Sequence, residues 1–170
     1  EAGHYPESFA VLDAALRELA NDPDLLYARA LAAEKIDRMD ILESDLRAIL
    51  AKDAKNAQAL NALGYTLADR TDRYQEALGY IEQALALLPD DAAVLDSMGW
   101  VQFRLGDFTK ALEFLRRAYQ LNPDPEIAAH LSEVLWAAGQ RDEAKKIWRE
   151  SLDKNPDSPY LRKVQERLGW

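Results

Sequence analysis

The chain of 170 residues contains no cysteine, which excludes a disulfide framework, thiolate metal ligands and a thiol nucleophile. It has only seven glycines and seven prolines, while alanine and leucine dominate, and this composition favours helix over sheet. No apolar run approaches the roughly 20 residues that a membrane-crossing helix needs. A signal peptide and a lipidation motif are also absent from the sequence.

Positive charge is scarce as well. The formal net charge is −9 and the pI is about 4.8, so the surface should repel phosphate backbones and nucleic-acid binding is not expected. Apolar residues make up 48% and charged residues 30%, which is typical of a folded domain rather than a disordered chain.

Residues of fixed size class recur at a nearly constant spacing along the chain. The period that starts at Ala92 carries, in order, Leu95, Gly99, Gly106, Asp107, Phe108, Ala111, Leu115, Ala118 and Pro123. One period earlier the corresponding residues are Leu60, Leu63, Gly64, Tyr74, Ala77, Ile81, Ala84 and Pro89. One period later they are Leu131, Ser132, Gly139, Ala144, Trp148, Ser151 and Pro156. This combination resembles the tetratricopeptide repeat.

The sizes of these residues explain how such a repeat folds. Small residues such as Gly99 and Ala111 let two antiparallel helices approach closely, Gly106 and Gly139 allow the tight turn between them, and proline ends the second helix. One repeat cannot bury its apolar faces alone, so neighbours must stack. We therefore expect an all-α, right-handed superhelical solenoid of about ten helices.

The repeat pattern predicts a single tetratricopeptide domain over residues 1–170. Its parts, in chain order, are a half repeat at 3–20, repeats at about 23–56, 57–91, 92–124 and 125–158, and a C-terminal capping helix at 159–170. The first full repeat is worn, with Arg29 and Leu42 where the family prefers Leu and Ala, and this divergence could mark a contact. Because the chain opens with Glu and Gly3 fits the middle of a repeat, we expect a fragment of a longer protein.

The sequence offers little material for catalysis. The histidines, His4 and His130, are expected to be ordinary surface or boundary residues. The glycines fall at repeat positions rather than in a phosphate loop, and the paired aspartates fall where N-caps belong. We therefore predict no catalytic residue, no cofactor and no metal site. A hydrolase would need a convergent acid, base and nucleophile.

A binding surface has better support. The resemblance implies that fixed positions of the first helix of each repeat line a concave groove, and these positions carry aromatic and charged residues. The predicted partner-binding residues are Tyr65, Asp69, Asp96, Trp100, Phe103, Arg104, Glu133 and Trp136. Exposed aromatic side chains rimmed by charge are typical of protein-binding surfaces. An acidic groove of this kind suits an apolar or basic segment, such as an amphipathic helix. Alanine at Trp100 and Phe103 is expected to weaken partner binding without loss of helix.

Three stretches, at residues 63–70, 94–100 and 133–139, carry a closer resemblance. Over about residues 57–155 the chain resembles the C-terminal repeats of Pseudomonas-type outer-membrane tetratricopeptide lipoproteins that bind a carboxyl-terminal processing protease. The resemblance implies a periplasmic adaptor that activates the protease and brings it substrates such as peptidoglycan cross-link hydrolases. It also implies a lipid anchor on the outer membrane, although the lipid-bearing cysteine is not in this chain.

Two functions remain open at this point. The first is a non-enzymatic adaptor for a protein or peptide ligand, with no membrane contact by this segment. The alternative is a structural module that self-assembles or binds another periplasmic partner. Neither the oligomeric state nor the polarity of binding follows from the sequence.

Overall fold

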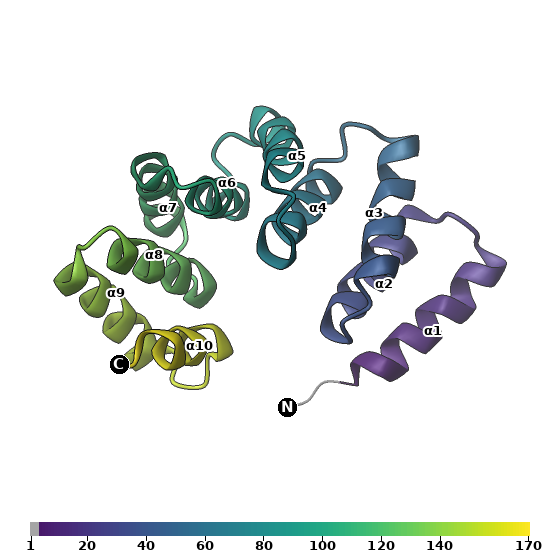
Figure 1. Ribbon diagram of the computed structural model, residues 1–170. Coiled ribbons are helices and arrows are strands. Elements are labelled where there is room, and N and C mark those ends of the chain that lie inside the picture. The colour runs from purple at the N-terminus through teal and green to yellow at the C-terminus, as the bar shows by residue number, and fades with distance from the viewer. Residues whose placement is uncertain (1–3) are drawn as a thin grey trace. The chain divides into compact units, whose positions relative to one another are not determined.

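The computed structural model describes residues 4–170, which form ten α-helices and no strand (Figure 1). The helices are α1 (Tyr5–Glu18), α2 (Pro23–Lys35), α3 (Met39–Lys52), α4 (Ala57–Arg70), α5 (Tyr74–Leu87), α6 (Ala92–Arg104), α7 (Phe108–Leu121), α8 (Pro125–Ala137), α9 (Arg141–Lys154) and α10 (Pro159–Leu168). The predicted all-α class and the number of helices are therefore confirmed.

The chain divides into two compact units. The N-terminal unit ends at Leu63 and holds α1, α2, α3 and the first half of α4, while the C-terminal unit runs from Gly64 to Trp170. The repeat boundaries within one domain of residues 1–170 stay a prediction, and Gly3, at the start of the half repeat, lies outside the described residues.

Helices follow one another as packed neighbours within each unit. In the C-terminal unit α6 packs on α7, α8 on α9, and α10 on both α8 and α9 (Figure 1). In the N-terminal unit α2 packs on both α1 and α3. Within each unit, a helix therefore packs mainly against helices that are close to it in the sequence, as a solenoid requires.

Short polar and turn residues set the helix ends. Asp22, Asp91, Asp124 and Ser158 are N-caps whose side chains accept hydrogen bonds from main-chain N–H groups of the first turn. Gly106 and Gly139 have φ of +85° and +81°, which confirms their predicted place in the turns between paired helices. Asn21 and Asp37 adopt this left-handed conformation in the N-terminal unit.

One of the two divergent residues of the first full repeat, Arg29, is the centre of an internal ion cluster. Arg29 donates to both carboxylate oxygens of Asp45, at 2.7 and 2.8 Å, and to Asp13 at 2.6 Å. Asp45 is buried, and Leu42 is part of the core. The Arg29 guanidinium, with help from Arg17, lowers the pKa of Asp13. Arg29 therefore joins α1, α2 and α3 to one another, which gives this divergence a structural reason.

Close helix approach in the C-terminal unit depends on two glycines. A Cβ at Gly64 would lie 2.5 Å from a side-chain carbon of Ile81 and 3.0 Å from the main-chain oxygen of Ala77. A Cβ at Gly99 would meet Leu115 and the oxygen of Ala111 at the same two distances. The main chains of paired helices thus touch where no side chain fits.

We expect Gly99→Ala to lower the free energy of unfolding by roughly 1–3 kcal/mol, because the added methyl forces α6 and α7 apart. Gly79 supplies a matched control, since it lies inside α5 and nothing is within 4 Å of its would-be Cβ. Gly79→Ala should raise the free energy of unfolding by about 0.5–1 kcal/mol through helix propensity. Urea denaturation followed by circular dichroism measures both, and equal effects of the two variants would contradict the close-approach explanation.

Candidate protein-binding site

The predicted binding residues all lie on α4, α6 and α8 in the C-terminal unit. The structure divides them by burial. Asp96, Trp100 and Glu133 are buried, whereas the other five are half-buried: Tyr65, Asp69, Phe103, Arg104 and Trp136. The accessible part of the predicted surface therefore consists of these five side chains.

The expectation of an exposed Trp100 ring is wrong. Only 3% of Trp100 is exposed. Its indole stacks on the imidazole of His130, with ring centroids 4.3 Å apart, and packs beside Phe103 at 5.3 Å. Since α6 and α8 pack directly on each other, the space in front of Trp100 is filled by α8. Trp100 is thus part of the floor of the surface.

The expectation that His130 is an ordinary surface or boundary residue is also wrong, whereas His4 is exposed as predicted. His130 is buried on α8, and its Nδ1 lies 2.9 and 3.0 Å from the two carboxylate oxygens of Asp96 on α6. Its Nε2 lies 3.4 Å from the hydroxyl of Tyr65 on α4, and that hydroxyl donates to Glu126 at 3.0 Å. We call these four side chains the Asp96–Glu126 array.

Burial and neighbouring carboxylates shift the pKa values within this array. Burial raises the pKa of Tyr65 well above its ordinary range, and the charges of Glu126, Asp69 and Asp96 add to the shift. Burial also raises the pKa of Glu126. For His130, burial favours the neutral ring, but the Asp96 carboxylate and the charges of Glu126 and Asp69 outweigh it, so the pKa of His130 is raised.

A second group of side chains lies at the C-terminal end of α6. The Arg104 guanidinium donates to the Tyr74 hydroxyl at 2.6 Å and to the main-chain oxygen of Asp69 at 3.3 Å. Phe103 meets Phe108 edge to face, with centroids 5.7 Å apart. The Asp69 carboxylate, in contrast, accepts no hydrogen bond and forms no ion pair within the described part of the chain.

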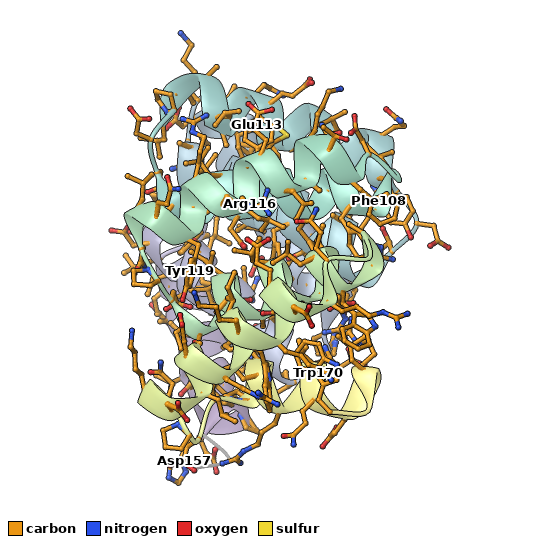
Figure 2. The ribbon with its side chains drawn as sticks, turned by 90° about the vertical axis from the view of Figure 1, so that its left-hand side faces the viewer. Phe108, Glu113, Arg116, Tyr119, Asp157 and Trp170 are labelled. Carbon is orange, nitrogen blue, oxygen red and sulfur yellow. The ribbon has the colours of Figure 1, made fainter. Side chains whose placement is uncertain are left out.

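Trp136 lies in a third group, around the end of the chain. The Trp170 ring makes edge contacts with Trp136 and Trp148, at 5.1 and 5.2 Å between centroids, and Figure 2 labels Trp170 beside α10. The cations of Arg141 and Lys145 lie over the Trp136 ring.

Two further buried side chains near Trp136, those of Glu133 and Trp148, have their polar groups paired within the chain. Glu133 pairs with Arg167 of α10. The indole of Trp148 is buried and donates to the main-chain oxygen of Leu161 at 2.9 Å, as expected of a large residue at a fixed repeat position. The charge of Glu133 is therefore balanced by Arg167, and the Trp136 ring is partly covered by Trp170.

The half-buried rings and carboxylates of these groups can contact a partner through apolar packing and charge. Residues 4–170 contain no group of three potential ligands that could hold a metal ion. Nor does any helix in this range combine the length and apolar character needed to cross a bilayer. The His130–Asp96 pair has the Tyr65 phenol at its far nitrogen, and a phenol held protonated by burial is a poor nucleophile.

Sequence reasoning missed His130 as a member of the site. The available signal was its separation of 34 residues from Asp96, which is one repeat period, because first helices of successive repeats pack side by side. The hydrogen bond between Tyr65 and Glu126 spans 61 residues and has no signature in the repeat spacing.

We expect Trp100→Ala to lower the free energy of unfolding by roughly 3–5 kcal/mol, because it leaves a large cavity between α6 and α8. This replaces the expectation that the change would act on binding alone. Trp100→Phe keeps a ring against His130 and also removes a buried indole N–H that has no hydrogen-bond partner, so its cost should be much smaller. Urea denaturation at neutral pH measures the difference. Equal, small losses for both variants would show that Trp100 is not a core residue.

Comparison with known proteins agrees with this architecture. The tetratricopeptide repeat family matches residues 56–124 and 102–168, which together span about two thirds of the chain. The TPR repeat-containing protein PA4667 of Pseudomonas aeruginosa is 50% identical over 127 residues, or 75% of this chain. The match covers 22% of that relative, so the chain spans about a fifth of its length.

Solved structures show the same fold at lower identity. A thermophilic TPR protein of Thermus thermophilus superposes with a TM-score of 0.83 and 24% identity, over 99% of this chain and 92% of that one. MamA of Desulfovibrio magneticus superposes with a TM-score of 0.71 and 21% identity, over 92% and 89% of the two chains. Such repeats are typically non-enzymatic modules for protein–protein interaction. The repeat pattern, the helix pairs and the family match together place the chain in the tetratricopeptide repeat family.

Proposed function

We propose that the chain is a non-enzymatic adaptor that docks and activates a periplasmic carboxyl-terminal processing protease and presents substrates such as peptidoglycan hydrolases to it. The docking surface is the side of α4, α6 and α8 that carries Tyr65, Asp69, Phe103, Glu126 and Trp136. We place this adaptor at the periplasmic face of the outer membrane.

The observation that carries the proposal is a set of half-buried aromatic and acidic side chains with spare binding capacity. Tyr65, Phe103 and Trp136 present rings, and Asp69 has no partner for its carboxylate within the described residues. Glu126 accepts a hydrogen bond from Tyr65 and forms no ion pair with Lys or Arg there. Aromatic rings beside carboxylates that lack a Lys or Arg partner favour a partner segment with apolar and basic residues.

The nature of the partner is suggested by resemblance. Residues 57–155 resemble the repeats of lipoproteins that bind a carboxyl-terminal processing protease, and the Pseudomonas relative with 50% identity matches three quarters of this chain. Because this chain spans about a fifth of that relative, other parts of a longer protein could contribute to activation and substrate delivery.

The proposal predicts that the double variant Asp69→Asn, Glu126→Gln weakens binding to a purified carboxyl-terminal processing protease roughly tenfold, because two charge contacts are lost. The affinity of the double variant should also depend less on salt. Biolayer interferometry at two salt concentrations measures both effects. Peptide cleavage by the protease, with and without the chain, reports on activation.

Glu113→Gln is the matched control for this experiment. Glu113 is an exposed carboxylate on α7, labelled in Figure 2, and it lies on a different helix from the proposed surface. The Glu113→Gln variant should bind the protease as tightly as the unchanged chain does. If the control loses as much affinity as the double variant, or if neither loses any, the acidic side of α4, α6 and α8 is not the docking surface.

Self-assembly is a second candidate, favoured by exposed apolar side chains on α1 and at its C-cap. Val11 and Leu19 are 68% and 60% exposed, more than the other large apolar side chains among the described residues. Sedimentation velocity over a wide concentration range separates the candidates. Association that Val11→Glu abolishes would support assembly through α1, while a monomer at all concentrations removes this candidate.

A further inference from the structure

Four side chains of the C-terminal unit join three helices through one continuous set of hydrogen bonds. Asp96 of α6 holds Nδ1 of His130 on α8, while Nε2 of His130 faces the hydroxyl of Tyr65 on α4. The same hydroxyl donates to Glu126, which lies one helical turn before His130.

The tyrosine hydroxyl has a single proton, and this limits which protonation states satisfy the array. If His130 is protonated, its Nε2–H donates to the Tyr65 oxygen while the Tyr65 O–H donates to ionised Glu126. If the imidazole is neutral and Glu126 is protonated, Glu126 donates to Tyr65 and Tyr65 donates to Nε2. Both states hold the same number of protons and every hydrogen bond.

The two states interconvert by moving two protons together. Tyr65 gives its proton to Glu126 and takes one from Nε2 of His130, or the reverse, so no charge is created on the phenol. Burial keeps the phenol protonated throughout. Removal of one proton leaves neutral His130 and ionised Glu126. Then either Nε2 or the Glu126 carboxylate lacks its hydrogen bond, because Tyr65 can donate to only one of them.

The charges that face the array make that loss costly. Tyr65 and Asp69 face it from α4, Asp96 from α6 and Glu126 from α8, so three carboxylates surround the imidazole. The guanidinium of Arg104 on α6 binds the Tyr74 hydroxyl and the main-chain oxygen of Asp69 instead. Arg167 of α10 is paired with Glu133. Both guanidinium groups are thus engaged elsewhere, and the shared proton offsets part of the negative charge of the three carboxylates.

We propose that Asp96, His130, Tyr65 and Glu126 form a proton-linked tie, which holds α4, α6 and α8 together while one proton is shared between His130 and Glu126 and loosens when that proton leaves. Two of its members, Tyr65 and Glu126, belong to the proposed docking surface, and the other two, Asp96 and His130, are buried beneath it. Its effect on partner affinity rests on the proposed function, whereas its effect on the fold does not.

The sign of the pH dependence follows from the direction of the shifts. The pKa values of His130 and Glu126 are both raised in the folded chain, so the folded state holds more protons than the unfolded state above their ordinary pKa values. The stabilisation is complete at pH values below the ordinary ones and is lost as pH rises through the raised values. For His130 this window starts at its ordinary pKa of about 6.5.

The first test uses the His4→Gln variant, which leaves His130 as the single imidazole of the chain. Long-range ¹H–¹⁵N NMR of this imidazole over pH 5–10 should show a midpoint above about 6.5. Asp96→Asn in the same background should move the midpoint down by roughly 1–3 units. Tyr65→Phe should lower it as well, because Nε2 loses its acceptor. A midpoint at or below 6.5 in the His4→Gln chain overturns the proposal.

The second test is the pH dependence of unfolding. In the His4→Gln chain the unfolding equilibrium constant should rise by up to tenfold per pH unit within the window, which is the slope for one linked proton. His130→Gln with His4 retained should lose this slope, and His4→Gln is its matched control. Equal slopes in the two chains contradict the tie. If His130→Gln does not fold, the same comparison made with Tyr65→Phe decides, since that variant keeps the ring and the imidazole.

Neither test requires a partner protein, so the imidazole titration and the pH dependence of unfolding test the tie even if the proposed protease docking fails. If the tie is confirmed and the docking fails, His130 and Glu126 regulate the stability of this unit alone. If docking is confirmed and the imidazole titrates at or below its ordinary pKa, the docking surface stands without a proton-linked element.

Discussion

The contact between main chains at Gly64 and Gly99 is the constraint on which the C-terminal unit depends. Each glycine lies against the carbonyl oxygen of an alanine on the paired helix, at Ala77 and Ala111. Because no side chain separates the helices there, Ile81 and Leu115 lie directly against these glycines and are fully buried. Successive pairs can then pack through their first helices, and this brings α4, α6 and α8 together on one side.

That close packing explains why polar residues of α6 and α8 are buried. Asp96 and His130 meet because α6 and α8 are in direct contact, and Trp100 is covered by the same contact. Buried charged groups are stable only when they are paired and hydrogen-bonded, and here each has a partner from another helix. The surface that a partner would meet therefore consists of half-buried rings and carboxylates above a polar floor, rather than an exposed aromatic patch.

The repeat spacing predicted the fold but only part of the site. Gly106, Gly139 and the glycine–alanine contacts are local consequences of one period, so residue size at fixed positions was enough to predict them. The burial of Trp100 and His130 depends on how closely one repeat lies on the next, and the link from Tyr65 to His130 spans 65 residues. Periodicity states which face a residue lies on, but not how deep it lies there. The ion pairs of Arg29 could not be predicted from the repeat spacing for a similar reason, since its partners Asp13 and Asp45 lie on two other helices.

Hydrogen–deuterium exchange of the chain, alone and with a purified carboxyl-terminal processing protease, tests most directly whether the first helices of the repeats form the docking surface. The account predicts slower exchange in α6, α8 and residues 64–70 of α4 when the protease is bound. The paired helices α5, α7 and α9 should change little. Protection confined to α5, α7 and α9, or to α1, would contradict it.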